Sequence, residues 1–125
     1  MTDEEMAEYL RESGYPEHVI RAGRKGLIER WRHFVEEAEK GYRFGLEDYR
    51  NDLDVRGILR LVGLDGQVAE LDQRFEALLT DRSKRVWESA PDNPYWDFGY
   101  PRNAHAQLLE DIKNEGLDSQ APLSQ

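Results

Sequence analysis

Apolar side chains recur at intervals of three and four residues over most of the chain. The pattern is clearest between Val68 and Leu79, where the apolar positions are Val68, Leu71, Phe75, Leu78 and Leu79. This spacing places them on one face of a helix and leaves the charged residues on the other face. The segment therefore predicts a helix that buries Phe75 against Trp31 or Leu53. The spacing continues as far as Trp87, so the helix is expected to extend to that residue.

A second apolar stripe runs through residues 17–40. Its members are Ile20, Leu27, Trp31, Phe34, Val35 and Ala38. Gly23 and Gly26 interrupt the stripe, and a glycine inside a helix costs about 1 kcal/mol relative to alanine. Two alternatives follow: another helix packs closely against these glycines, or the helix breaks near Gly23. Gly41 is expected to end the segment, because glycine favours the position just after a helix.

The first helix is predicted from its end signals. Thr2 and Glu5 have the spacing of a capping box, in which each side chain binds the backbone N–H of the other residue. A helix over residues 3–12 is expected to follow and to stop at Gly14.

Two further helices are predicted with less regular patterns. Residues 46–62 carry apolar side chains that do not share one stripe, and Asp52 or Asp54 could cap a fresh helix, so a kink is expected near residues 51–54. Asn103 is the expected N-cap of a last helix that ends at Gly116.

Together these segments predict an all-α fold, because apolar and polar residues nowhere alternate as they would in a strand. We expect one compact domain of about five helices over residues 1–116, in an antiparallel, bundle-like arrangement. A loop rich in proline and aromatic residues, 89–101, precedes the last helix. Residues 117–125 have little to bury and are expected to form a disordered tail.

Charge and composition narrow the functional classes. The chain has 125 residues and a formal net charge of −9, which disfavours binding to nucleic acid or to anionic membranes. It has no cysteine, which excludes disulfides and thiolate chemistry. No stretch approaches 18 apolar residues, and the acidic start does not resemble a secretory signal. We therefore expect a cytoplasmic protein.

Motifs for catalysis, cofactors or metals are missing from the sequence. The three histidines, His18, His33 and His105, are scattered, and no phosphate-binding glycine loop occurs. We expect no cofactor and no metal site.

Asp48 and Asp52 are one helical turn apart and could together ligate a divalent ion. The favoured alternative is that Arg50, Arg56 or helix caps satisfy them.

The most unusual local feature is the loop over residues 90–101. Four aromatic residues, Tyr95, Trp96, Phe98 and Tyr100, occur within six positions and are flanked by prolines. In one interpretation these rings cover the end of the helical core, which is the commoner fate of a long loop. In the other, Tyr95, Trp96, Asp97 and Tyr100 form a binding surface, since tyrosine and tryptophan are enriched at binding hot spots.

Two functional classes stay open. The favoured one is a non-enzymatic protein-binding or regulatory domain, for example an acidic inhibitor or immunity-type partner of a basic protein. The alternative is a small metal-dependent or carboxylate-using enzyme with a site around Asp48 and Asp52. Convergent carboxylates and a histidine in one pocket would favour the enzyme, whereas an exposed aromatic patch rimmed by acids would favour the binding protein. The oligomeric state stays open, and a homo-oligomer is compatible with the sequence.

Overall fold

The computed structural model describes residues 2–79 and 100–114, and the regular elements in this part of the chain are helical. They are α1 (Asp3–Glu12), α2 (Glu17–Lys40), α3 (Leu46–Leu61), the 3₁₀ helix η1 (Asp65–Val68), α4 (Ala69–Glu76) and α5 (Ala106–Asn114). The predicted all-α fold of about five helices is confirmed.

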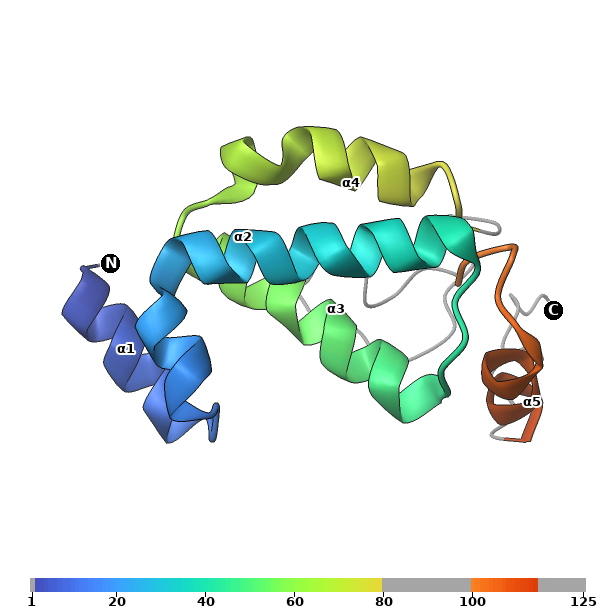
Figure 1. Cartoon of the computed structure of the whole chain (residues 1–125), viewed down its shortest axis with the longest axis horizontal. Helices are drawn as coiled ribbons and strands as arrows, with labels where there is room; N and C mark the ends of the chain where they lie inside the picture. Colours follow the sequence, from blue (N-terminus) through green and yellow to red (C-terminus); the bar gives the residue numbers. More distant parts are fainter. Residues whose placement is uncertain (1, 80–99, 115–125) are drawn as a thin grey trace, which may run out of the picture.

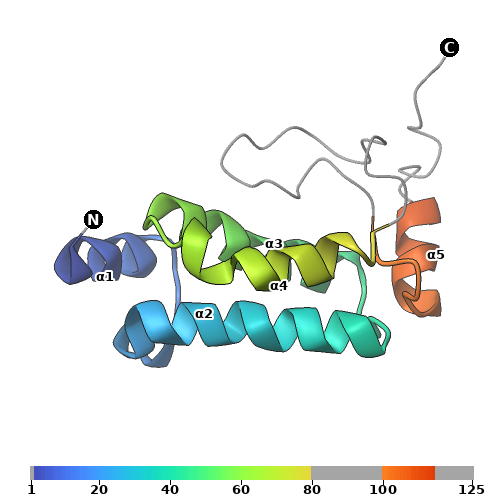
Figure 2. The ribbon, with the colours of Figure 1, turned by 90° about the horizontal axis from the view of Figure 1, so that it is seen from above.

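Helix α2 is the centre of the arrangement (Figure 1). It packs against α1, α3 and α4, and α5 packs against α3. Helix α3 runs back along α2 in the opposite direction, and α4 returns in the direction of α2 (Figure 1). Figure 2 shows α3 and α4 in one layer and α2 in a second layer, with α1 and α5 at opposite ends of the molecule.

The start of α1 follows its local signals. The Thr2 hydroxyl accepts a hydrogen bond from the Glu5 backbone N–H at 3.1 Å, and the Glu5 carboxylate accepts one from the Thr2 N–H at 2.8 Å. The predicted capping box is therefore confirmed. The helix ends at Glu12, and Gly14 takes the left-handed conformation with φ of 86°.

Helix α2 breaks at Gly23, which decides between the two alternatives left open by its glycines. Gly23 has φ of 63° and ψ of −152°, a conformation that interrupts the helix and that residues with a side chain rarely adopt. Met6 of α1 packs nearby, 3.9 Å from where a Gly23 Cβ would stand. The bend lets the first turns of α2 lie beside α1 while the longer part crosses α3 and α4.

Helix α3 is continuous, so the kink expected near residues 51–54 is wrong. Asp52 and Asp54 lie inside the helix and cap nothing. The apolar pattern is irregular because α3 is covered on more than one side, by α2 and by α5. Its buried residues are Leu46, Tyr49, Leu53, Val55, Arg56, Gly57, Ile58 and Leu59.

Helix α4 is shorter than its spacing predicts. It ends at Glu76, and Leu79 forms an isolated antiparallel bridge with Pro101, so an unbroken helix as far as Trp87 is wrong. The Arg102 N–H donates to the Leu78 carbonyl at 2.8 Å beside this bridge. Backbone pairing with a distant segment replaces the next helical turn.

Helix α5 begins at Ala106, so the expected N-cap at Asn103 is also wrong. The Asn103 side-chain amide donates instead to the Glu39 carbonyl at 3.0 Å, near the C-terminus of α2. The Asn103 side chain therefore makes a tertiary hydrogen bond instead of capping a helix. The predicted end at Gly116 and the tail 117–125 lie outside the described residues.

Aromatic side chains fill the centre of the core. Phe75 is fully buried, and its ring centroid lies 5.4 Å from that of Trp31 and 5.3 Å from that of Phe34. The predicted contact between Phe75 and Trp31 is confirmed. Tyr49 of α3 reaches the same cluster, with its ring centroid 6.0 Å from that of Phe34.

Candidate functional site

A pocket of about 350 Å³ opens between α2, the connection over residues 41–45 and α3. We call it the α2–α3 pocket. Its lining residues are Glu29, Arg30, His33, Phe34, Glu37, Tyr42, Phe44, Asp52 and Val55. This volume lies near the lower end of the range for small-molecule sites, roughly 300–1,000 Å³.

One part of the pocket wall is aromatic and apolar. Phe34, Tyr42 and Val55 are buried, whereas the Phe44 side chain is 49% exposed. The ring centroid of Tyr42 lies 5.8 Å from that of Phe44 and 5.8 Å from that of Phe34. Three neighbouring rings, Phe34, Tyr42 and Phe44, therefore extend from the core to the surface.

The polar part of the wall is organised by Asp52 and Tyr42. The Tyr42 hydroxyl donates to Asp52 Oδ2 at 2.7 Å. Burial raises the pKa of Asp52, although the hydrogen bond from Tyr42 and the positive charge of Arg30 act to lower it. Burial, together with the hydrogen bond to Asp52, raises the pKa of Tyr42 far above its usual value. Tyr42 is therefore a neutral donor to a half-buried carboxylate.

Acidic side chains dominate the charge of the lining. Among the described lining residues, the carboxylates of Glu29, Glu37 and Asp52 outnumber the guanidinium of Arg30. Glu29 also pairs with Arg32 at 3.2 Å. Glu37 has longer contacts, 3.7 Å to the Lys40 amine and 3.6 Å to the Arg43 guanidinium. The pocket therefore combines an apolar wall with an acidic rim.

Helix α5 holds the connection that carries Tyr42 and Phe44. The His105 N–H donates to the Tyr42 carbonyl at 2.7 Å, and Gly41 turns the chain with φ of 117°. At the other end, the Leu46 N–H donates to Asp111 Oδ2 at 3.0 Å. These contacts fix both ends of the connection, so the pocket depends on a helix that does not line it.

The two aspartates that the sequence paired have different surroundings, although the charge of Asp48 still acts on Asp52. Asp52 lines the pocket, whereas Asp48 is exposed and is not part of the lining. Of the partners expected for Asp52, which were Arg50, Arg56 or a helix cap, Arg56 binds Asp72 and Asp65 instead, and Asp52 accepts its hydrogen bond from Tyr42. Across residues 2–79 and 100–114, no three His, Asp or Glu side chains are grouped so that they could hold a metal ion.

Sequence reasoning missed Tyr42 and Phe44 as site residues. They stand between two glycines in Gly41–Gly45, in a short connection between helices, where two aromatic residues are more than a turn requires. The sequence did not indicate which of the three histidines would lie near the carboxylates, and the structure places His33 in the pocket with Asp52.

Most of the predicted aromatic binding surface cannot be compared with the structure. Tyr95, Trp96 and Asp97 lie outside the described residues. Tyr100 is half-buried and packs against the core cluster, and Pro101 beside it is buried. The described end of the loop therefore covers the core, while the role of the other three residues stays a prediction.

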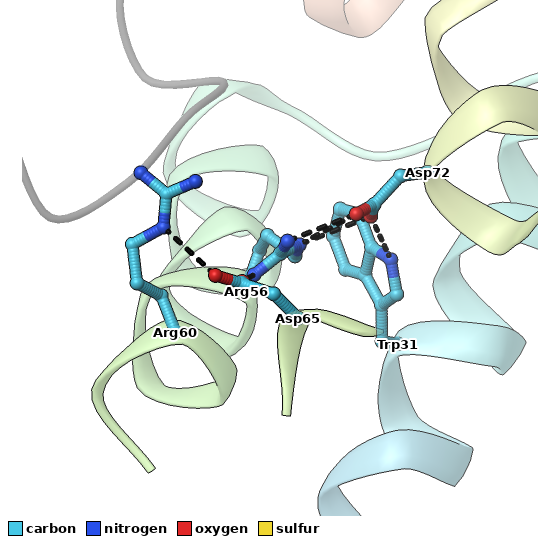
Figure 3. A network of polar contacts seen from close by, with 5 residues as sticks. All are labelled: Trp31, Arg56, Arg60, Asp65 and Asp72. Atoms are coloured by element: carbon cyan, nitrogen blue, oxygen red, sulfur yellow. Dashed lines mark hydrogen bonds and ion pairs between the residues drawn. The ribbon is translucent and has the colours of Figure 1, made fainter. Parts of the chain in front are cut away.

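A second polar cluster lies in the core and has a structural role (Figure 3). Arg56 is 2% exposed, and its guanidinium donates to both oxygens of Asp72 at 2.9–3.2 Å. Asp72 Oδ1 also accepts the Trp31 indole N–H at 3.0 Å, and Asp65 pairs with Arg56 at 2.6 Å. Burial alone would lower the pKa of Arg56, but its bonds to the two carboxylates raise it. The cluster ties α2, α3, η1 and α4 together.

None of the helices in the described ranges has the length and apolar character needed to cross a membrane. Comparisons with protein-family models, with curated proteins and with solved structures find no match to this chain.

Proposed function

We propose that this protein is a non-enzymatic protein-binding or regulatory domain that recognises a basic partner through the α2–α3 pocket. The observation that carries the proposal is the exposed ring of Phe44 beside the three pocket carboxylates. The formal net charge of −9 supports it, because an acidic molecule attracts a basic partner during diffusional encounter.

Phe44 has the features of a binding anchor. At 49% exposure it is more exposed than Leu61 and Leu109, each 41%, which are the other large exposed apolar residues in the described part of the chain. Its ring packs against the buried Tyr42, so it is held in place before a partner arrives. A preorganised aromatic ring beside a polar rim is typical of interface hot spots.

A carboxylate-using enzyme is the second candidate, favoured by the presence of Asp52 and His33 in one pocket and by the raised pKa of Asp52. One observation ranks it below binding. None of the described lining residues is Ser, Thr, Cys or Lys, and the only lining hydroxyl belongs to the neutral Tyr42.

The test is affinity capture from the producing cells, followed by measurement of Kd for each purified partner. We expect a partner of high isoelectric point, with an affinity that falls as salt is added. Phe44→Ala should weaken binding by more than about 2 kcal/mol, as hot-spot truncations do. Leu61→Ala is the matched control, because it removes a similarly exposed apolar side chain outside the pocket and should leave Kd unchanged. A partner bound equally by Phe44→Ala and wild type would refute the proposal.

A further inference from the structure

The α2–α3 pocket has the size of a site for one long side chain. Its volume is about 350 Å³, and its apolar wall consists of Phe34, Tyr42, Phe44 and Val55. The pocket is too small for a folded element of a partner and ends on a half-buried carboxylate, that of Asp52. A ligand that matches both parts needs an apolar stem and a positively charged end.

The carboxylate at this end retains capacity for another donor. Tyr42 binds only Oδ2 of Asp52, and an ionised carboxylate accepts several hydrogen bonds through its two oxygens. Glu37 lines the same pocket, and its cationic neighbours in the described part of the chain, Lys40 and Arg43, lie 3.7 Å and 3.6 Å away. Those distances are longer than hydrogen bonds, so a better-placed cation can replace these contacts.

The aromatic wall distinguishes between the two cationic side chains of proteins. A planar guanidinium stacks on an aromatic ring and donates to carboxylates along two directions, whereas an ammonium is a strongly hydrated point charge. Phe44 presents an exposed ring beside the carboxylates, which is the combination that favours a guanidinium.

We infer that the α2–α3 pocket binds the side chain of one arginine of the partner, with the stem against Phe44 and Val55 and the guanidinium toward Asp52 and Glu37. This inference rests on the proposed function, and it names the chemical group that the partner supplies. Arg30 is the competitor already present, because its positive charge lies close enough to Asp52 to act on it. Removing Arg30 should therefore strengthen binding.

The test titrates the full chain with Nα-acetyl-arginine amide and follows the backbone amides of Phe44 and Val55 by NMR. The citrulline analogue has nearly the same shape without the charge and should bind at least about tenfold more weakly. The lysine analogue should also bind more weakly than the arginine analogue. Equal binding of the arginine and citrulline analogues, or no shift of these amides with the arginine analogue, would overturn the inference.

Three variants locate the site. Asp52→Asn keeps an acceptor for the Tyr42 hydroxyl but removes the charge, and it should weaken the arginine analogue about tenfold. Glu47→Gln, at an exposed position of α3 outside the pocket lining, is the matched control and should bind as wild type. Arg30→Gln should bind several-fold more tightly, a gain that loss of folding cannot produce. Equal affinities for Asp52→Asn and Glu47→Gln would overturn the assignment.

The two proposals fail separately. If a basic partner is captured through Phe44 while the arginine analogue does not bind, the arginine assignment is wrong and the binding function stands. If the arginine analogue binds in the pocket, but the Phe44→Ala variant captures the same partners as the wild-type protein, the proposed binding function is wrong.

Discussion

Arg56 carries a positive charge in the interior of the protein, where a charge without partners is strongly unfavourable. Its buried guanidinium is compensated by two carboxylates with different surroundings, since the side chain of Asp72 is 13% exposed and that of Asp65 is 47% exposed. Removing one partner of a buried ion pair leaves an uncompensated charge, which costs far more than breaking an exposed pair. The two aspartates should therefore differ in their importance for stability.

Asp72→Ala is expected to lower the free energy of unfolding by about 3–5 kcal/mol, because Arg56 loses its bidentate partner and the Trp31 indole N–H loses its acceptor. Asp65→Ala should cost only about 1 kcal/mol, since that carboxylate is half exposed. Urea denaturation of both variants gives the comparison. Similar losses in the two variants would contradict the ranking.

Asp52 gives stability a dependence on pH. Burial raises its pKa above the ordinary value of 3.8, so the folded protein holds this proton more tightly than the unfolded chain. The resulting contribution to stability is complete below pH 3.8 and is lost as pH rises through the raised pKa. Asp52→Asn has no ionised carboxylate to bury, so it should be more stable than wild type at neutral pH.

The measurement is urea denaturation of wild type and Asp52→Asn across the acidic to neutral range. The advantage of the variant should grow as pH rises and shrink toward the acid end. Glu47→Gln, at an exposed position of the same helix, is the control and should show no such trend. An advantage of Asp52→Asn that is constant with pH would show that titration of Asp52 is not its cause.

At the scale of elements, α3 is capped by a helix that is distant in sequence. Its N-cap residue is Gly45, which has no side chain to cap with, and Asp111 of α5 supplies the carboxylate. A Cβ at Gly45 would stand 2.4 Å from Asp111 Oδ2, so the glycine makes room for this contact. A negative charge at a helix N-terminus also interacts favourably with the helix dipole.

Asp111→Ala should therefore destabilise the protein by about 1 kcal/mol, the usual cost of removing an N-cap side chain. Glu110→Ala, an exposed neighbour on α5, is the control and should change stability by less than about 0.5 kcal/mol. Thermal unfolding followed by circular dichroism gives both values. Equal melting temperatures for the two variants would show that the cap contributes nothing.

For the whole molecule, the aromatic cluster joins the two helix layers. Phe75 of α4 meets Trp31 and Phe34 of α2, and Tyr49 of α3 extends the cluster. Phe75→Ala should cost about 3–5 kcal/mol, as is usual for a buried aromatic side chain. Leu109→Ala, at a 41% exposed position of α5, should cost much less. Denaturant unfolding tests both, and an unchanged midpoint for Phe75→Ala would contradict this core.

The sequence by itself determined the fold class, the helix ends that are coded locally and one core contact. The capping box at Thr2 and Glu5 and the stop at Gly14 were predictable, and the break at Gly23 was one of the two alternatives that the sequence left open. They depend on hydrogen bonds and backbone conformations within a few residues, which the local sequence specifies. The stripe through Phe75 also indicated its burial, because helical periodicity defines a buried face.

The tertiary structure decided what lies beyond that local range. Asp111 caps α3 from 65 residues away, Asn103 binds Glu39 instead of starting a helix, and Asp52 takes Tyr42 as its partner. The 41–45 connection that lines the α2–α3 pocket is likewise held by His105 and Asp111, which are more than 60 residues away in the sequence. The periodicity of a sequence shows which face of a helix is buried. The periodicity does not show which distant polar groups a helix will contact, because these contacts depend on how the helices cross.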